Sequence, residues 1–424
     1  MCGLTGFWDR TQASSGEELA RLVSGMTETL FRRGPDDSGI WVEETSGMAL
    51  GFRRLAIVDL SPNGHQPMIS ANGRFVIAFN GEIYNHRELR RELEGLGVRF
   101  RGTGDTEVML EGFVQWGVQA TVKRLIGMFA IALFDRETRT LTLMRDRLGI
   151  KPLYWGRFGE LMLFGSELKA LRAHPGWVPE INQGVASAFL RFAYVPAPHS
   201  IYTQVKKLEQ GTLLILGAGG EERIERFWSF PEIVREGQAR RIDVSDDEAT
   251  DQLEGLLKDA VGRRMIADVP LGAFLSGGVD SSTVAALMQA QSNRPVRTFT
   301  IGFREADYNE AEHAKAIARH LGTDHTELYV EPAHAQEVIP GLAEYYDEPF
   351  ADSSQIPTFL ISELTRNHVT VALSGDGGDE LFAGYNRYFW APDLWRRVNL
   401  LPPPARRALA AALRSLPPGG WDRL

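Results

Sequence analysis

The chain opens with MCGLTGFWDR, residues 1–10, and Cys2 is the single cysteine among its 424 residues. A disulfide within the chain is therefore impossible, and a cysteine-based metal site is nearly so. If Met1 is removed, the thiol of Cys2 stands beside its own α-amine, whose pKa of about 8 lets it act as a base. The alternative is a small residue at a frayed terminus. Position alone does not decide between the two, but the segments that follow do.

Composition and charge limit the class of protein. The chain carries 46 basic and 55 acidic residues, a net charge of −9, whereas proteins that wrap nucleic acid or anionic membranes are usually basic. No apolar run approaches the ~20 residues that span a bilayer. The first residues lack the basic and apolar regions of a signal peptide. We therefore expect a cytoplasmic enzyme that binds neither nucleic acid nor membrane, with a homodimer left open.

From residue 3 to about 210 the sequence is dense in short strands and turns. The strand patterns are Gly3–Trp8, Gly39–Val42, Arg54–Asp59, Phe75–Phe79, Met128–Phe134, Thr140–Arg145 and Leu161–Gly165. Two helical patterns, Ser15–Phe31 and His86–Leu96, interrupt them. Strands with helices on their outer faces predict an α+β sandwich over residues 1–212. The run GAGGEE at 217–222 is expected to be a hairpin tip.

The rhythm changes after a polar stretch, Pro231–Asp247, so 213–247 is expected to be a connection. Beyond it, strands alternate with helices, which predicts an α/β domain with a parallel sheet over 248–424. The expected helices are Asp251–Ile266, Ser282–Gln291, Asn309–His320 and Gln355–Arg366, and the expected strands are Gly272–Leu275, Arg297–Ile301, His325–Val330 and Val369–Leu373. A further helix is expected after Pro402.

Four polar signatures recur at strand ends in the first part of the chain. They are Arg33-Gly34-Pro35-Asp36, Arg54-Leu55-Ala56-Ile57-Val58-Asp59, Asn80-Gly81-Glu82-Ile83-Tyr84-Asn85 and Gly104-Asp105-Thr106-Glu107. Taken singly, each has an ordinary explanation, because Asn-Gly after a strand is common in hairpins and Asp105 suits a helix N-cap. Their joint occurrence after MCGLTGF is much more specific.

Together these segments resemble the class II glutamine amidotransferase domain, an N-terminal-nucleophile hydrolase. The resemblance implies that Cys2 is the nucleophile and that Asn80 and Gly81 form an oxyanion hole, where losing a donor typically costs about 100-fold or more. It implies a glutamine site made of Arg54, Ile57, Val58, Asn80, Gly81, Glu82 and Asp105. In it, the planar donor of Arg54 would bind the α-carboxylate, and the two acids would receive the α-ammonium. One departure is Arg32, where the family often has His. We interpret it as a tolerated change near the lid of the site.

The segment LSGGVDSS, residues 275–282, follows a strand pattern and opens a helix. That arrangement aims free backbone N–H groups and the positive helix end at an anion. The alternative is a plain Gly-Ser turn, and a Walker A loop is excluded because no Gly-Lys-Ser/Thr is present. A second segment, SGDGGDE at 374–380, follows another strand; its carboxylates suit Mg²⁺, although a solvated acidic turn is the alternative.

SGGVDS resembles the pyrophosphate loop of AMP-forming ATP pyrophosphatases. The resemblance implies that ATP is bound by Leu275, Ser276, Gly277, Gly278, Asp280, Ser281, Ser282, Ile301, Ser374 and Gly375. It also implies Asp280 and Asp379 as Mg²⁺ ligands and Asp376 beside the acyl intermediate.

Taken together, the two parts of the chain resemble the glutamine-hydrolysing asparagine synthetases, over almost the whole sequence. Such an enzyme activates a carboxylate as an acyl-adenylate and attacks it with ammonia freed from glutamine. Aspartate is the expected acyl substrate, with Met128–Phe134 as either tunnel wall or plain core. Amidation of a surface polysaccharide or peptide is an alternative, because Asp376 stands where aspartate-specific enzymes carry Glu.

The family's C-terminal part, with its phosphate-neutralising lysine, is expected to be missing. After residue 240 the only lysines are Lys258 and Lys315. A glutaminase without synthetase activity, or a non-catalytic regulator with an exposed apolar patch around 381–415, are therefore further alternatives.

Overall fold

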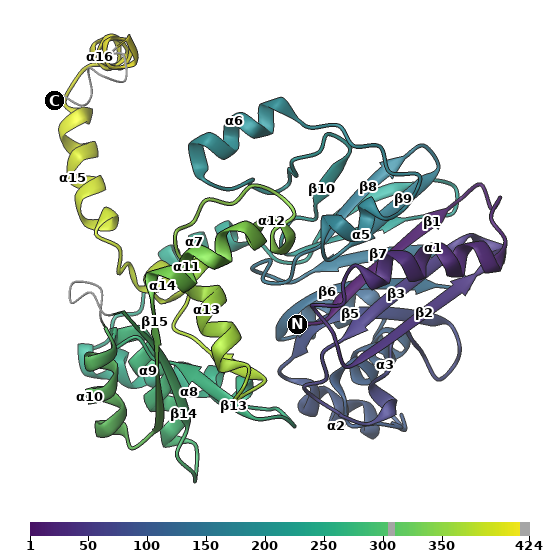
Figure 1. Cartoon of the computed structure of the whole chain (residues 1–424), viewed down its shortest axis with the longest axis horizontal. Helices are drawn as coiled ribbons and strands as arrows, with labels where there is room; N and C mark the ends of the chain where they lie inside the picture. The colour runs from purple at the N-terminus through teal and green to yellow at the C-terminus, as the bar shows by residue number, and fades with distance from the viewer. Residues whose placement is uncertain (304–309, 416–424) are drawn as a thin grey trace.

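The computed structural model describes residues 1–303 and 310–415 (Figure 1). Its first half contains two six-stranded antiparallel sheets, in the orders β10-β8-β9-β1-β3-β2 and β12-β11-β7-β6-β5-β4. The first sheet comprises β1 (Gly3–Asp9), β2 (Asp37–Glu43), β3 (Met48–Arg54), β8 (Tyr154–Phe158), β9 (Leu161–Gly165) and β10 (Val205–Lys207). The second comprises β4 (Met68–Ile69), β5 (Phe75–Ile83), β6 (Gly127–Asp135), β7 (Thr140–Arg145), β11 (Thr212–Leu216) and β12 (Glu222–Arg226).

The two sheets share a core, and helices cover their outer faces. Between the sheets, buried side chains such as Trp8 and Phe52 meet Phe134 of the opposite sheet. The helices are α1 (Gly16–Glu28), α2 (His86–Gly95), α3 (Asp105–Trp116), α4 (Val118–Arg124), α5 (Leu168–Arg172) and α6 (Gln183–Phe192). α1 packs on the first sheet, and α2, α3 and α4 pack on the second. The predicted α+β sandwich is therefore confirmed.

Local sequence explains where α1 begins. Ser15 is its N-cap and accepts a hydrogen bond from the backbone N–H of Glu18 at 3.3 Å. This Ser-x-x-Glu spacing is the capping box, which satisfies backbone donors that a helix start leaves free. The helix then turns Leu19, Val23 and Met26 into the core. α1 thereby closes the outer face of the sheet whose central strand, β1, begins next to Cys2.

Two expectations for the first half are wrong. Arg54–Asp59 was expected to be a strand, but β3 ends at Arg54 and residues 55–59 form a loop. The chain leaves the sheet there because the Arg54 guanidinium binds the carbonyl oxygens of Asp59 and Ser61, which folds the loop back on it. The stretch 213–226 was assigned to a connection, but it forms β11 and β12, joined by the expected hairpin tip.

The second half has a four-stranded sheet in the order β15-β14-β13-β16, in which all neighbouring strands are parallel. The strands are β13 (Leu271–Phe274), β14 (Arg297–Phe303), β15 (Asp324–Val330) and β16 (Val371–Leu373). The predicted parallel sheet is confirmed. Successive strands are added on one side of β13, and then β16 is added on its other side. The order therefore reverses between β13 and β16, the kind of crevice in which open α/β sheets bind ligands.

Ten helices of the second half lie within the described residues. They are α7 (Phe230–Ala239), α8 (Asp246–Arg264), α9 (Val279–Ala290), α10 (Ala311–Leu321), α11 (Pro332–Val338), α12 (Leu342–Tyr345), α13 (Gln355–Thr365), α14 (Gly378–Phe382), α15 (Arg387–Asn399) and α16 (Pro403–Ser415). The stretch Pro231–Asp247 was expected to be an irregular connection, but α7 covers its first half and α8 begins at Asp246. α7 contributes no buried residue: Phe230, Ile233 and Val234 recur at helical spacing but are exposed. Asn309, the first residue of one expected helix, lies outside the described residues.

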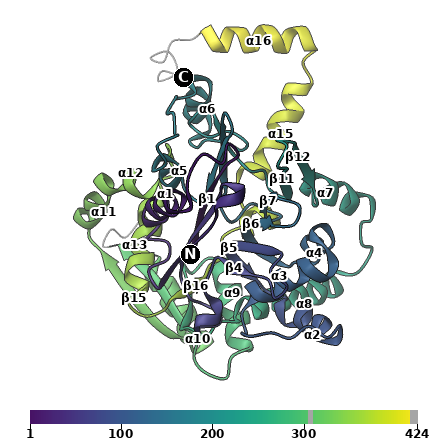
Figure 2. The same cartoon turned by 90° about the vertical axis from the view of Figure 1, so that its right-hand side faces the viewer.

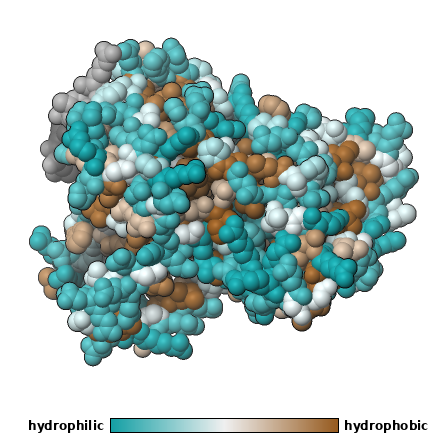
Figure 3. Space-filling view, turned by 90° about the horizontal axis from the view of Figure 1, so that it is seen from below, coloured by the Kyte–Doolittle hydropathy of each residue, from teal (hydrophilic) through white to brown (hydrophobic). Residues whose placement is uncertain are grey.

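The last helices form an arm that extends away from both halves (Figures 1 and 2). Within the described residues, α14, α15 and α16 contribute no buried side chain. Large apolar side chains are instead exposed along it, namely Leu381, Phe382, Tyr388, Phe389, Trp390, Leu394, Trp395, Leu400, Leu401, Leu409 and Leu413. The lower face of the molecule, by contrast, is mostly hydrophilic with smaller hydrophobic patches (Figure 3). An exposed apolar stretch of this length is unusual in a monomeric domain.

Charged contacts join the two halves. Lys169 pairs with Asp347 at 3.4 Å, and Lys207 pairs with Glu348. Asp268 is bound twice to the loop after β3: its N–H donates to the carbonyl of Ile57 at 2.9 Å, and its carboxylate accepts from the N–H of Asp59 at 2.8 Å. The N-terminus lies close to β16, and Met1 lines one pocket with Val371 and Ala372 of that strand (Figure 2).

Arg32 takes part in the same contact between the halves. Its guanidinium lies 3.1 Å from the Glu344 carboxylate and 4.7 Å from the centre of the Tyr345 ring. Both members of the ion pair are exposed, so the pair adds little stability. The interpretation of Arg32 as a tolerated change near the lid of the site stays a prediction, and the structure shows that its partners belong to the second half.

Candidate functional site

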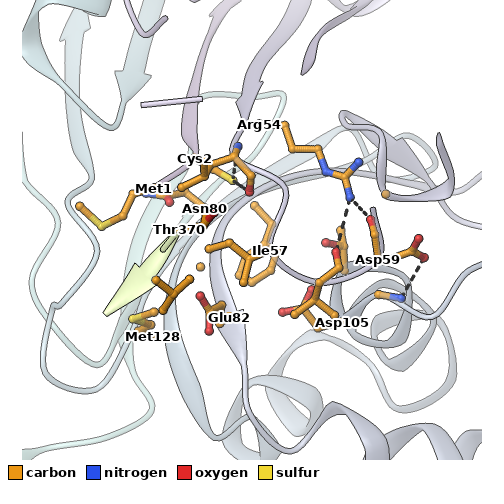
Figure 4. A pocket seen from close by; sticks show the side chains of 18 of the residues that line it. Met1, Cys2, Arg54, Ile57, Asp59, Asn80, Glu82, Asp105, Met128 and Thr370 are labelled. Carbon is orange, nitrogen blue, oxygen red and sulfur yellow. Dashed lines mark hydrogen bonds between the residues drawn. The ribbon is translucent and has the colours of Figure 1, made fainter. Parts of the chain in front are cut away.

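A pocket of about 450 Å³ lies where the two halves meet (Figure 4). All the residues predicted for the glutamine site line it: Cys2, Arg54, Ile57, Val58, Asn80, Gly81, Glu82 and Asp105. From the second half it is lined by Phe274, Ser362, Thr365, Arg366, Val369, Thr370, Val371 and Ala372. The pocket thus extends from the strand ends of the sandwich to β13 and β16 of the parallel sheet.

Cys2 stands at the start of β1 with its sulfur beside the backbone of Leu55. The Leu55 N–H donates to Sγ at 3.3 Å, and the thiol donates to the Leu55 carbonyl at 3.5 Å. The Arg33 guanidinium holds the Cys2 carbonyl oxygen at 2.8 Å and pairs with Glu167. Burial raises the pKa of the Cys2 thiol. The residue is fixed in place, but its thiol needs help to ionise.

Met1 also lies in the pocket (Figure 4). Burial lowers the pKa of its α-amine to about 5, so an amine at this position is uncharged at neutral pH. Its sulfur accepts a hydrogen bond from Nζ of Lys151 at 3.0 Å. The amine expected to act as base is that of Cys2 after Met1 is removed, which is a different group from the Met1 amine.

Asn80 lies on β5 and is 1% exposed, yet neither its Nδ2 nor its Oδ1 has a hydrogen-bond partner within the part of the chain described. A buried amide without partners is costly and unusual in a folded protein. The side chain lines the same pocket as Cys2 (Figure 4). Asn80 can therefore donate to an oxygen that enters the pocket, which is what an oxyanion hole requires.

Arg54 is buried, and its guanidinium is held by the loop that follows it. It donates to the carbonyl oxygens of Ser61 at 3.2 Å and of Asp59. The carboxylate of Asp59 in turn accepts from the N–H groups of Thr103 at 2.7 Å and Gly104 at 3.2 Å. This network fixes Arg54 at the edge of the pocket and ties its loop to the start of α3, where Asp105 lies.

Two carboxylates face the pocket from neighbouring elements. Asp105 is the first residue of α3, after an N-cap at Gly104, and its Oδ2 accepts from the N–H of Ile83 at 2.8 Å. Burial raises the pKa of Asp105, and burial together with Asp105 raises the pKa of Glu82 to about 7. Buried acids that repel each other in this way suit a cationic group between them.

Sequence reasoning missed two cations at this site. Arg33 stood in a quoted signature but was given no role, and its contact to the Cys2 carbonyl spans 31 positions of the chain. Lys151 was not singled out, because RDRLGIKP at 145–152 looks like an ordinary polar turn between strands. It is 4% exposed and lines the pocket. A lysine flanked by apolar residues directly after a turn was the available signal.

Apart from Ile301, which lies on β14, the predicted nucleotide residues lie on the segments that follow β13 and β16, including the first turn of α9. β13 and β16 flank the point where the sheet order reverses. The N-cap of α9 is Gly278, which provides no side-chain cap, so the first N–H groups of the helix stay available for an anion. The hydroxyls of Ser276 and Ser281 lie 2.9 Å apart, and that of Ser282 donates to the Gly278 carbonyl at 2.7 Å.

The second loop packs directly against the first. A Cβ built on Gly378 would stand 2.4 Å from the carboxylate of Asp280, and one on Gly375 would stand 2.7 Å from the backbone nitrogen of Ser281. The glycines thus bring Asp280 close to the segment that carries Asp379. The Ser374 hydroxyl donates to Asp376 at 2.9 Å.

The side chains of two other predicted nucleotide residues are packed into the core rather than free to contact a ligand. Leu275 is 1% exposed and packs in a core cluster with Ala285 and Ala314, so only its backbone can contact a ligand. Ile301 packs partly buried against another cluster of the second half. Gly277 adopts a φ of 84°, which suits glycine at the turn into α9.

The described residues contain neither a cluster of metal-binding side chains nor a membrane-spanning helix. Residues 1–303 and 310–415 contain no group of three or more His, Cys, Asp or Glu side chains placed to hold a metal ion. No helix in this part of the chain has the length and apolar character needed to cross a membrane.

Comparison with known families matches each half separately. A family described as "Glutamine amidotransferase domain" matches residues 1–228, and one described as "Asparagine synthase" matches residues 252–420. The first match includes β11 and β12, in agreement with the sheet.

Named relatives cover nearly the whole chain. Asparagine synthetase [glutamine-hydrolyzing] 1 of Bacillus subtilis is 33% identical over 92% of this chain and 59% of its own length. A protein of Mycobacterium tuberculosis, provisionally named asparagine synthetase, is 37% identical over 99% and 65%. One of Methanocaldococcus jannaschii, also provisionally so named, is 36% identical over 91% and 76%. The chain thus spans about 60–65% of the length of the first two relatives. On these matches, the chain belongs to the glutamine-hydrolysing asparagine synthetase family.

Proposed function

We propose that this chain catalyses glutamine-dependent, AMP-forming amide synthesis, with aspartate as the acyl substrate and asparagine as the product. One observation carries the proposal: a single pocket is lined both by Cys2 and Asn80 of the sandwich and by Phe274, Val371 and Ala372 of the parallel sheet. These three residues belong to the two strands whose following loops carry the predicted nucleotide residues. Glutamine chemistry and carboxylate activation would thus occur in the two halves that line one pocket.

In the glutamine half, removal of Met1 exposes the α-amine of Cys2. That amine takes the thiol proton, and the sulfur attacks the side-chain carbonyl of glutamine. Asn80 and Gly81 stabilise the resulting oxyanion, and ammonia leaves with the proton returned by the amine. Water then hydrolyses the thioester to release glutamate. Arg54 binds the α-carboxylate of glutamine, with Ile57 and Val58 beside it, while Glu82 and Asp105 bind its α-ammonium.

In the synthetase half, the loop 275–282 holds the β- and γ-phosphates of ATP. The aspartate side-chain carboxylate attacks the α-phosphorus, pyrophosphate leaves, and an aspartyl-adenylate forms near Asp376. Ammonia attacks the acyl carbon and AMP leaves. Ammonia must travel unprotonated, because ammonium has no lone pair. The apolar side chains of Met128, Phe274 and Val371 along the pocket favour the uncharged form.

Mg²⁺ fits this site as a two-carboxylate ion. Asp280 and Asp379 sit on loops packed together through Gly378, and Mg²⁺ is usually held by one or two carboxylates plus substrate phosphates. When bound, the ion would neutralise phosphate charge. The small number of protein ligands agrees with the lack of any three-residue cluster in the described residues.

The test measures pyrophosphate and glutamate release by the 424-residue chain with Mg-ATP and glutamine, with and without aspartate. Aspartate-dependent pyrophosphate that matches glutamate supports the proposal. Glutamate release without pyrophosphate would contradict it and favour a glutaminase. Pyrophosphate release that depends on a carboxylate other than aspartate would contradict only the assignment of aspartate as the acyl substrate. Absence of both products would favour a regulator, for which the exposed apolar arm is the motivating observation.

A further inference from the structure

The turn that follows β7 holds Lys151 in place from both sides. The buried carboxylate of Asp146 accepts hydrogen bonds from the N–H groups of Leu148 at 3.1 Å, Ile150 at 2.9 Å and Lys151 at 3.0 Å. The Arg145 guanidinium donates to the carbonyl of Lys151 at 2.9 Å and to that of Gly149 at 2.8 Å. Two charged side chains therefore fix the backbone of one short turn.

The turn presents the buried ammonium group of Lys151 to the pocket. Lys151 is 4% exposed, and its Nζ donates a hydrogen bond to the sulfur of Met1 at 3.0 Å. No carboxylate of the described residues lies within 4 Å of it, whereas Arg33 is paired with Glu167 and the Arg54 guanidinium is bound to the carbonyl oxygens of Asp59 and Ser61. A buried and uncompensated cation is costly unless an anion forms beside it.

Cys2 is the group in this pocket that becomes an anion during the proposed reaction. The charged and titratable groups around it are the Met1 α-amine, Arg33, Glu82, Asp105 and Lys151. Burial raises the pKa of the thiol most, and the Asp105 carboxylate adds to the rise. The uncompensated charge of Lys151 opposes both effects.

We propose that Lys151 is a positioning residue whose ammonium group stabilises the thiolate form of Cys2. The inference rests on the proposed function, in which Cys2 is the nucleophile. Lys151 acts through Cys2 and exchanges no proton with the substrate. Its effect is electrostatic, so another cation of similar reach should replace it.

The test is the rate of Cys2 alkylation by iodoacetamide as a function of pH, measured without glutamine on chains whose Met1 removal is verified by mass spectrometry. In Lys151→Met the pH midpoint should rise by about one unit, so that alkylation at pH 7 slows by about tenfold. Lys151→Arg should restore the wild-type midpoint. The exposed Lys123→Met is the matched control and should leave the curve unchanged. An unchanged midpoint in folded Lys151→Met would overturn the inference.

A second measurement needs no apolar substitution and applies even if Lys151→Met fails to fold. Lysines of the wild-type chain are labelled at Nζ for NMR, and the Lys151 signal is assigned by its absence in Lys151→Arg. Blocking Cys2 as a neutral thioether removes the thiolate, so the pKa of Lys151 should fall by about one unit. An unchanged Lys151 pKa would contradict the inference. Neither readout needs turnover, so a chain without glutaminase activity would refute the proposed function separately.

Discussion

The two candidate sites differ in how completely the surrounding chain encloses them. In the glutamine half, Asn80 and Arg54 are 1% and 8% exposed, and hydrogen bonds or ion pairs from several elements fix the neighbouring backbone. In the ATP half, Val279 at the start of α9 is 82% exposed, and Asp376 lies on an exposed loop. One site is built into a large core, whereas the other lies open at a sheet edge.

The difference follows from the packing behind each site. The sandwich has core clusters that combine both sheets and their helices, with many fully buried aromatic side chains. The parallel sheet is covered by smaller clusters, and the arm after it contributes no buried residue within the described part. The glutamine half should therefore behave as a finished domain, while the ATP half depends more on what covers it.

The largest expected effect separates the two sites by chemistry. In Cys2→Ala, glutamate release should fall by on the order of 10⁴–10⁶-fold, because the nucleophile is lost. Pyrophosphate release driven by ammonium chloride should persist, since the ATP loops are not touched. Both products are measured on the same sample. Glutamine-dependent glutamate release that survives would refute the assignment of Cys2.

The second prediction tests the strength of the core behind the glutamine site. Trp155 is 5% exposed and belongs to the core between the two sheets. Trp155→Ala should lower the free energy of unfolding by about 3–5 kcal/mol, because it removes a large buried ring and leaves a cavity. Urea denaturation followed by circular dichroism gives this value. A loss below about 1 kcal/mol would show that this half is not the rigid part of the molecule.

The third prediction concerns the orphaned amide. Asn80→Ala should lower kcat for glutamine hydrolysis by about 100–1,000-fold, with little change in KM, because an oxyanion donor acts mainly in the transition state. Asn85 is the matched control, since it is also buried but is engaged with Arg124 and Ile126. Asn85→Ala should lower stability and leave kcat nearly intact. The reverse pattern would assign the structural role to Asn80.

The fourth prediction uses the raised pKa of Glu82, which is about 7. Glu82 must be ionised to bind the α-ammonium, so kcat/KM for glutamine should rise with pH through about 7 and lie about tenfold below its plateau at pH 6. Glu82→Gln should lose this limb and remain low.

The stability of the fold should depend on pH in the opposite direction to activity, which provides a control for Glu82. A carboxyl whose pKa is raised from 4.5 on folding contributes stability that is complete below 4.5 and is lost as pH rises through about 7. Glu82→Gln should therefore be more stable than wild type at pH 8 and similar to it at pH 4. Thermal unfolding at the two pH values decides. A gain at pH 4 instead would contradict the raised pKa.

The smallest effect is expected in the arm, where an exposed tryptophan is removed for comparison with the buried Trp155. Trp395 is 61% exposed, so Trp395→Ala should change the free energy of unfolding by less than about 0.5 kcal/mol. The measurement is the same urea denaturation. A loss comparable with that of Trp155→Ala would mean that another molecule or copy covers the arm in solution, and that loss would then depend on protein concentration.

Sequence patterns predicted the layers of the fold better than the local paths of the chain. The near-continuous apolar runs of β1 and β6 indicate strands buried on both faces, and the structure buries nearly every residue of both. The segment from Leu55 to Asp59 shows the same residue types, yet it is a loop. Its apolar residues Ile57 and Val58 line a pocket rather than a sheet. Local β-propensity does not distinguish these two environments.

The site was predictable where residues act in sequence-local groups. Asn80, Gly81 and Glu82 sit together on β5, and the structure places them in one pocket with Cys2 and Arg54. Lys151 was not predictable in this way, because its closeness to the N-terminus depends on the packing of the first and second sheets. Asp268 was missed for the same reason, since it is 209 positions from its partner Asp59.

The two hydrogen bonds of Asp268 have a thermodynamic consequence. They fasten the loop that carries Ile57 and Asp59 to the segment entering β13, and β13 leads directly into the loop 275–282. A ligand that shifts β13 and, through Asp268, this loop would alter the affinity for glutamine, and glutamine would then alter the affinity for that ligand by the same factor. Each substrate can thus act as the effector of the other, without a separate regulatory domain.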